Sequence, residues 1–239
     1  MILFDDSYLI RGKSFAVNEH VIVNNPSLEE IFEFGEEKYY ALVSALVAKP
    51  SDYKVLLYDK GIDFETVNEF DFFCTAVNSI SRTESAILFG ELDFSAMRIY
   101  VDNRLRERVI GDGEVFIDPL SYAVITDFIR RINGIPVQKP ETYLNEHVKQ
   151  YRLGVERDNM KRKKSEPFKS MLLPLVSSYV NCPESRYGYE TVMKLTISQL
   201  HDGTQRVMKR VHYDNVMRGL YAGTIAQDKL NLDEINWLV

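Results

Sequence analysis

The residues best suited to bind a metal ion are few in this chain and lie far apart. They are four histidines and two cysteines in 239 residues: His20, His147, His201, His212, Cys74 and Cys182. No two histidines stand four residues apart, the spacing that places two ligands on one helix face, and the cysteines form no ligand pair. His201 with Asp202 and His212 with Asp214 are conceivable ligands, but we interpret them as polar helix residues. We expect no metal site and no cofactor.

Motifs for catalysis and nucleotide binding are also absent from the sequence. It contains no G-x-S-x-G element, no P-loop and no G-x-G-x-x-G loop. Gly111-Asp112-Gly113 is too short for a phosphate loop and is typical of a hairpin turn. The acidic pairs Asp5-Asp6 and Glu36-Glu37 each fall within one element, so we interpret them as solvated charges. We therefore expect no catalytic residues and a protein that is not an enzyme.

One basic run is the only arguable binding feature. The candidate partner-binding residues are Lys161, Arg162, Lys163 and Lys164. They end a segment, residues 136–166, that has eight basic and five acidic residues and is poor in large apolar ones. Its net charge of +3 leaves −9 on the rest of a chain whose total is −6. The run could contact an acidic partner, offset the dipole at a helix C-terminus, or be a solvated linker.

Composition is that of a soluble globular protein, with 45% hydrophobic and 27% charged residues. The acidic net charge disfavours nucleic acid as a partner. Met1-Ile2-Leu3-Phe4 is followed at once by two aspartates, so we expect no signal peptide, and no apolar run reaches membrane-spanning length. We expect a cytoplasmic protein with no membrane contact, in which both cysteines are free buried thiols.

The clearest helix start lies at residues 25–31. Asn25 can cap with Pro26 at the first helical position, or Ser27 can cap with Glu30 in a capping box. The sequence predicts one helix from about Ser27 to Ala48, preceded by short strands at residues 8–10, 15–17 and 21–23. Further helices are expected over about 52–60 and from Asp63, with a brief turn at Thr83-Glu84.

Residues 97–117 alternate in a β-like manner around two turn sequences and predict a small antiparallel meander. Pro119 then begins a helix that Asn133-Gly134 ends. Farther on, Pro174 should kink the apolar stretch 168–179, and Thr196 should cap a helix. The only tryptophan, Trp237, should dock the C-terminus onto the body of the protein.

These elements together indicate a mainly α fold of the α+β class. It is helix-rich, with a short N-terminal β segment and the small antiparallel meander near 97–117. We predict three parts: an N-terminal α+β lobe (1–135), a charged linker or exposed helix (136–166), and a C-terminal helical lobe (167–239).

Several blocks resemble a protein family encoded among the tail-assembly genes of phages and prophages of Gram-positive bacteria. The blocks are Asn25-Pro26-Ser27-Leu28-Glu29-Glu30-Ile31, Gly35-Glu36-Glu37-Lys38-Tyr39, Thr83-Glu84 through Gly90, Pro167-Phe168-Lys169-Ser170, Tyr189-Glu190-Thr191-Val192, and Tyr221-Ala222-Gly223 with Trp237. They consist of helix caps, turns and apolar stripes. They therefore specify a fold rather than a reaction, and there are no catalytic residues in the family to transfer.

The resemblance implies a non-enzymatic morphogenesis factor in the host cytoplasm, most specifically a tail assembly chaperone. Such a protein would bind the tape-measure protein, the tail tube protein or both. Two other functions stay open. One is a structural component of the tail or connector, and the other is an interaction or regulatory protein that acts on a host factor.

Overall fold

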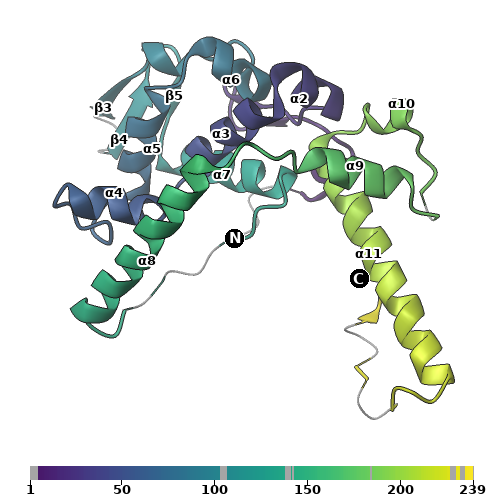
Figure 1. Cartoon of the computed structure of the whole chain (residues 1–239). Helices are drawn as coiled ribbons and strands as arrows, with labels where there is room; N and C mark the ends of the chain where they lie inside the picture. The colour runs from purple at the N-terminus through teal and green to yellow at the C-terminus, as the bar shows by residue number, and fades with distance from the viewer. Residues whose placement is uncertain are drawn as a thin grey trace.

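The computed structural model describes residues 5–102, 107–137, 141, 143–183, 185–226, 230–231 and 235–238, without the side chains of 163–165. The fold is mainly helical with two small antiparallel sheets, which confirms the predicted α+β, mainly α class (Figure 1).

The first half consists of short helices and two groups of short strands. They are α1 (Ser7–Ile10), β1 (Phe15–Ala16), β2 (Ile22–Val23), α2 (Leu28–Phe34), α3 (Glu36–Val47), η1 (Pro50–Tyr53), α4 (Lys54–Asp59), α5 (Glu69–Val77), α6 (Arg82–Phe89), η2 (Phe94–Ala96), β3 (Arg98–Asp102), β4 (Glu107–Gly111) and β5 (Phe116–Ile117). The second half is helical, with α7 (Pro119–Ile132), α8 (Glu146–Ser165), α9 (Leu172–Val180), α10 (Tyr189–Val192) and α11 (Ile197–Tyr221).

Helices α3, α5 and α7 pack together and supply much of the main core. Tyr39 of α3 is fully buried, and its hydroxyl donates a hydrogen bond to Asn133 Oδ1 at 2.9 Å. The ring of Phe73 in α5 lies 4.7 Å from that of Tyr122 in α7. Each fully buried large side chain of this kind contributes roughly 1.5–3 kcal/mol to stability.

Chain segments near the two ends are tied together at this core. The N-cap residues of α2 and α11, Ser27 and Thr196, form an antiparallel bridge. The Leu28 N–H donates to Leu195 O and the Ile197 N–H donates to Pro26 O, each at 2.9 Å. Residues 172, 176, 192, 197 and 200 belong to the same apolar core as the N-terminal helices. The division at 1–135 and 167–239 stays a prediction.

The predicted helix over 27–48 is in fact two helices. Ser27 caps α2 with Glu30 closing a capping box, so this alternative holds and Asn25 does not cap. Gly35 has φ 101° and interrupts the helix there, a backbone conformation that glycine adopts without a Cβ clash. Apolar residues follow helical spacing on both sides of Gly35, so the sequence pattern did not indicate the break.

The meander prediction is confirmed by the sheet β3-β4-β5, in which neighbouring strands are antiparallel. Gly111 is required where β4 ends, because a Cβ there would lie 2.4 Å from the Val115 carbonyl oxygen. The Asp112 carboxylate then accepts the N–H groups of Glu114 and Val115 and fixes the turn. The other turn was predicted at Asp102-Asn103, and Asn103 lies outside the described residues.

Two helices replace predicted non-helical segments. Residues 8–10, expected as a strand, lie in α1, whose first turn is supported by the Asp5 carboxylate accepting the Ser7 N–H. Thr83-Glu84, expected as a turn, lies inside α6, because Ser81 and Glu84 form a capping box. In both places local side chains satisfy the free N–H groups of a short helix.

Two predicted helix positions also need correction. The helix expected from Asp63 begins instead after Asn68, whose side chain accepts the N–H groups of Phe70 and Asp71. Pro174 causes no break, because α9 starts at Leu172 and the proline falls in its first turn. An N–H in the first turn has no partner within the helix, so proline costs little there.

Candidate interaction surface

Helix α11 has two parts with opposite environments. Its first turn enters the core, where Ile197, Ser198 and Leu200 are buried. The Ser198 hydroxyl donates to Leu9 O at 2.8 Å and accepts from Asn25 Nδ2 at 2.7 Å. Beyond this root the helix projects away from the body (Figure 1). The N-terminal segments therefore fix the direction in which α11 leaves the body.

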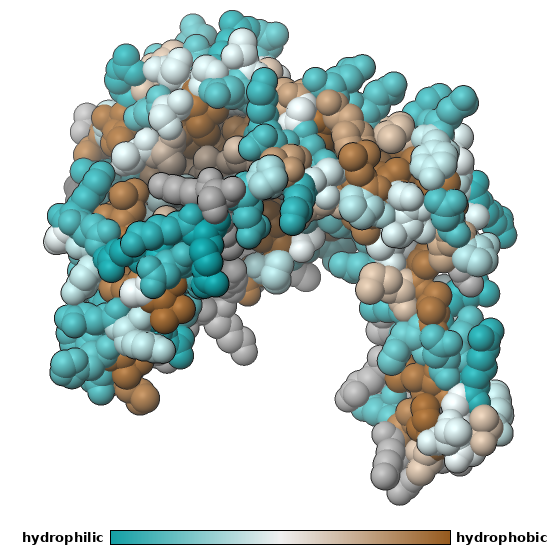
Figure 2. Space-filling view, in the orientation of Figure 1, coloured by the Kyte–Doolittle hydropathy of each residue, from teal (hydrophilic) through white to brown (hydrophobic). Residues whose placement is uncertain are grey.

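The outer part of α11, residues 205–221, has many apolar side chains and buries none of them completely. These apolar residues are Val207, Met208, Val211, Tyr213, Val216, Met217, Leu220 and Tyr221. Met208 is 66% exposed and Tyr221 is 82% exposed. Val211 is also exposed, and the other five are half-buried. Figure 2 shows hydrophobic residues running along this helix between hydrophilic ones. Exposed apolar side chains that lie close together, as Met208 and Val211 do, are typical of interaction sites.

A C-terminal strap, residues 235–238, lies against part of this surface. The Arg206 guanidinium donates to the Trp237 carbonyl oxygen at 3.2 Å, and the Arg210 guanidinium lies 5.5 Å from the Trp237 ring. Trp237 was expected to dock onto the body, and it docks onto the outer part of α11 instead. The strap reaches Arg206 and Arg210, whereas Met208 and Tyr221 remain largely exposed.

The charge of the outer part is positive. Residues 205–221 contain four basic residues, Arg206, Lys209, Arg210 and Arg218, and one acidic residue, Asp214. Asp202 of the preceding turn lies 3.7 Å from Arg206. The surface thus combines apolar side chains with a basic rim on a protein whose net charge is −6. This combination favours a partner with acidic residues beside an apolar stripe.

Helix α8 is the second element that projects from the body, on the same side as α11 (Figure 1). Residue Lys149 anchors it: its Nζ lies 2.6 Å from Glu65 Oε2 and 3.2 Å from Asp63 Oδ1, and 4.7 Å from the centre of the Phe64 ring. Tyr151 is 74% exposed on the same helix. Figure 2 shows an open hollow between the two projecting helices.

The predicted basic run lies in the last turns of α8. Lys161 is exposed and lies 3.8 Å from Asp158, and Arg162 donates to Asn159 Oδ1. The side chains of Lys163 and Lys164 lie outside the described residues. The run therefore lies at the C-terminal end of a helix, which agrees with one of the three interpretations of the sequence. Its role in binding a partner stays a prediction.

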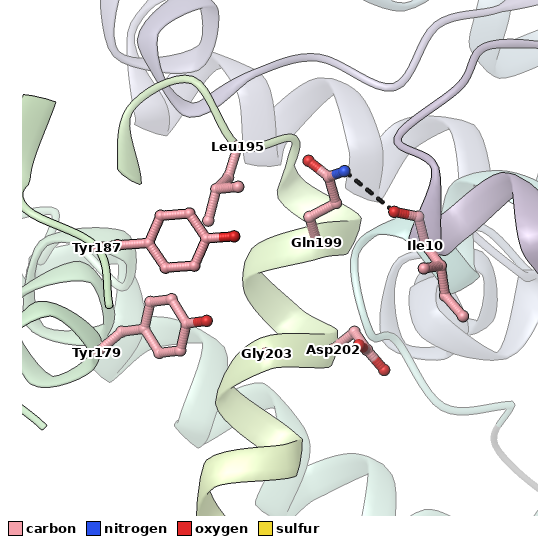
Figure 3. A pocket seen from close by; sticks show the side chains of 7 residues that line it. All are labelled: Ile10, Tyr179, Tyr187, Leu195, Gln199, Asp202 and Gly203. Carbon is pink, nitrogen blue, oxygen red and sulfur yellow. Dashed lines mark hydrogen bonds between the residues drawn. The ribbon is translucent and has the colours of Figure 1, made fainter. Parts of the chain in front are cut away.

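A cavity of about 190 Å³ opens at the root of α11 (Figure 3). It is lined by Ile10, Tyr179, Tyr187, Leu195, Gln199, Asp202 and Gly203. The two tyrosine rings stack with centroids 5.8 Å apart and direct their hydroxyls toward α11, while Gln199 Nε2 donates to Ile10 O at 3.0 Å. None of the seven lining residues is a cysteine, serine, lysine or histidine. The cavity offers an aromatic wall and one carboxylate.

His201 precedes Asp202 in α11 and is half-buried, with its ring close to Gly134. Its Nε2 has no hydrogen-bond partner within the described part of the chain, and burial lowers the pKa of the imidazole below its usual value. Asp202 lines the cavity, and its carboxylate lies 3.7 Å from Arg206. Over the described residues, no group of three His, Cys, Asp or Glu side chains is placed to hold a metal ion.

The two cysteines differ in their environments. Cys74 is buried in α5 and free, and burial raises its pKa to about 12, so the thiol stays protonated and unreactive. Cys182 is only half-buried, so the expectation that both thiols are buried is wrong for this one. It follows α9, where the chain leaves the core.

The sequence analysis did not identify the outer part of α11 as a surface. The apolar residues from Val207 to Tyr221 recur every few positions, as they do in a helix that packs on a core, and such spacing is the same for exposed and buried residues. What distinguishes this stretch is its high content of basic residues within the same turns. A core-facing helix of this length would confine those charges to one side.

Residues 161–239 match the family model described as the YomV second domain. The match covers about a third of the chain and includes the end of α8, helices α9 to α11 and the strap. YomV is a protein of a Bacillus prophage region. The match is consistent with a phage-related origin. No curated protein and no solved structure matches this chain.

None of the helices in the described ranges is both long enough and apolar enough to cross a membrane.

Proposed function

We propose that this protein is a non-enzymatic phage or prophage morphogenesis factor, most specifically a tail assembly chaperone. It binds the tape-measure protein, the tail tube protein or both in the cytoplasm of the bacterial host. The observation that carries this proposal is the outer part of α11. It presents eight apolar residues with none fully buried, within the segment that matches a prophage-region domain.

Physically, a long helical client exposes apolar seams until its final partners cover them. An exposed amphipathic helix can cover such a seam by side-by-side packing, with anchors at i, i+3, i+4 and i+7. Met208 and Val211 stand three residues apart, at i and i+3, and are 66% and 39% exposed. The basic rim around them would pair with acidic residues that flank the seam of the client.

The test is co-purification of the tagged full chain with tape-measure and tube proteins during particle production in its own host. The decisive variant is Met208→Glu combined with Val211→Glu, which places two charges in the proposed contact. The matched control is Leu120→Glu in α7, which is 60% exposed but lies on the body. We expect the double variant to recover at least about tenfold less client than the wild-type chain, and the control to recover as much as the wild-type chain.

Three results would contradict the proposal. One is equal recovery of tail protein by the wild-type chain and the double variant. Another is recovery of host proteins only, which would favour a regulatory function. The third is the presence of this chain at fixed stoichiometry in purified particles, which would identify a structural component of the tail or connector.

A further inference from the structure

The outer edge of strand β3 is open and apolar. The strand order β3-β4-β5 leaves β3 at the edge of its sheet, and no described residue pairs with its second side. Ile99, Tyr100 and Val101 are 43%, 40% and 58% exposed. Figure 1 shows β3 at the periphery of the body, away from α8 and α11. This edge is therefore separate from the surface proposed to bind tail proteins.

Edge strands in stable monomers are usually guarded against pairing. Common guards are charged side chains, above all lysine, a proline within the strand, a bulge, or a covering helix or loop. β3 carries its charged residues only at its two ends, Arg98 and Asp102, has no lysine or proline, and pairs regularly with β4 over all five residues. A row of backbone N–H and C=O groups flanked by three exposed apolar side chains is a template for another strand.

The residues of β3 are complementary to themselves when the strand is reversed. In an antiparallel pair centred on Tyr100, Arg98 faces Asp102 of the second copy, and Ile99 faces Val101. Tyr100 faces its own equivalent. Opposite charges, β-branched pairs and aromatic pairs are the cross-strand combinations that stabilise antiparallel sheets. This register also overlaps all five residues, which no other two-fold register of the strand does.

The two faces of such a pair would also match. Register places Ile99 beside Ile110 and Val101 beside Arg108, so Ile99 and Val101 share the face that includes the core residues Ile110 and Ile117. Arg108 on this face is paired with Asp71 of α5 at 2.7 Å. The exposed Ile99 and Val101 thus form the uncovered margin of an apolar face, and a second copy would continue that face across the two-fold axis.

We propose that this chain forms a two-fold dimer in which β3 pairs antiparallel with β3 of a second copy, centred on Tyr100. The two three-stranded sheets then become one six-stranded sheet. A two-fold interface uses the same patch on both subunits, so each charge pair and each apolar pair occurs twice. The proposal does not depend on the identity of the tail client.

The first test is a charge exchange measured by analytical ultracentrifugation of the full chain. Arg98→Asp places aspartate opposite Asp102 at both ends of the interface, and Asp102→Arg places arginine opposite Arg98. Each single variant should raise the dimer dissociation constant by about tenfold or more. The double variant R98D/D102R restores opposite charges and should return the dissociation constant to within about threefold of the wild-type value.

The rescue separates pairing from folding. Arg98 also donates to the carbonyl oxygens of Ser95 and Met97, and an effect through those bonds would persist in the double variant. Circular dichroism and the unfolding midpoint show whether each variant folds. If either single variant fails to fold, Val101→Lys places a guard on the edge and should give a folded monomer.

The second test is a cross-link on the axis. Tyr100→Cys places two thiols directly opposite each other, at Cα separations that suit a disulfide. We expect rapid covalent dimer formation on mild oxidation. The matched control is Phe116→Cys, which is 44% exposed on β5 at the opposite edge of the same sheet. The wild-type chain controls for Cys74 and Cys182.

The proposal is overturned if the wild-type chain is a monomer at the highest soluble concentration. It is also overturned if a dimer forms whose dissociation constant is the same in the wild-type chain and in both single charge variants, or if Phe116→Cys cross-links as fast as Tyr100→Cys. Loss of client binding in the α11 variants, with the dimer intact, would concern the proposed function alone.

Discussion

Helices α7 and α11 begin alike and end in opposite environments. Each has a polar N-cap, Asp118 or Thr196, and each continues with apolar residues at helical spacing. In α7 the stripe is buried along the whole helix, from Tyr122 to Ile132. In α11 burial stops at Leu200, although the helix continues for 21 residues. Regular apolar spacing therefore specifies a helix, whereas burial depends on what lies opposite.

The largest expected difference between these helices comes from truncating one apolar side chain in each. Phe128 of α7 is fully buried and its ring lies 5.5 Å from that of Phe15. Phe128→Ala should lower the free energy of unfolding by about 3–5 kcal/mol through lost burial and a cavity. Met208→Ala should change it by less than about 0.5 kcal/mol, because this side chain is 66% exposed.

Urea denaturation followed by circular dichroism measures both values. Similar destabilisation by the two substitutions would show that the outer part of α11 is packed in solution, and the contrast with α7 would fail.

A second comparison uses two helix-interior glycines, Gly203 at the root of α11 and Gly154 in α8. A Cβ on Gly203 would lie 2.5 Å from the Tyr179 hydroxyl oxygen and 2.9 Å from its Cζ, whereas none of the described atoms lies within 4 Å at Gly154. Gly203→Ala should displace the Tyr179 ring and lower stability by about 1–3 kcal/mol. Gly154→Ala should raise stability by about 0.5–1 kcal/mol through helix propensity.

Thermal unfolding of both variants tests this pair. If Gly203→Ala is stabilising, the Tyr179 ring can move away from α11 at little cost in free energy.

The root of α11 should also respond to pH through His201. Burial lowers the pKa of this imidazole below 6.5 in the folded chain, so below pH 6.5 the unfolded chain takes up a proton that the folded chain does not. Stability is therefore unaffected above this range and falls as the pH decreases through it. The loss attributable to His201 should grow as the pH falls below 6.5, until the folded chain also takes up the proton.

The measurement is the free energy of unfolding at pH 7.5 and about pH 5.5, for the wild-type chain and His201→Gln. The variant should show a smaller loss at the lower pH, since the other titrating groups are common to both proteins. An identical loss in both would mean that His201 is accessible to protons in the folded state.

The smallest effect is expected at the strap. Arg210→Ala removes the guanidinium that lies 5.5 Å from the Trp237 ring and should lower stability by less than about 1 kcal/mol. Trp237 is the only tryptophan, so its fluorescence reports the strap directly. We expect the emission to shift to the red as the indole becomes more hydrated. The control is Leu120→Ala, which should leave the emission unchanged. Unchanged emission in Arg210→Ala would show that other contacts hold the strap.

Prediction from the sequence succeeded where structure is determined within a few residues. The capping box of Ser27 and Glu30, the hairpin at Gly111-Asp112-Gly113 and the helix from Pro119 are all present. Prediction failed where a residue is compatible with two local structures. Gly35 either continues or interrupts a helix, and Pro174 is harmless only if the helix starts at Leu172.

For the candidate surface, the sequence pointed to the basic run at residues 161–164 and not to the outer part of α11. Four consecutive charges are conspicuous in a sequence, whereas exposed apolar residues look identical to buried ones. The sequence also gave no indication that β3 is an edge strand with an open side, because strand order depends on which segments meet.

The sequence by itself determined the helix-rich class, the caps Ser27 and Thr196, the turn at Gly111-Asp112-Gly113, and the charge contrast between residues 136–166 and the rest. The caps and turns arise from interactions between residues a few positions apart, and the charge contrast follows from composition alone. Only the tertiary structure decided which apolar stripes are covered. Asn25 bonds Ser198, and Pro26 bonds Ile197, across more than 170 positions of the chain. These contacts bury the first turn of α11, send the rest of the helix into solvent, and leave β3 at an open edge.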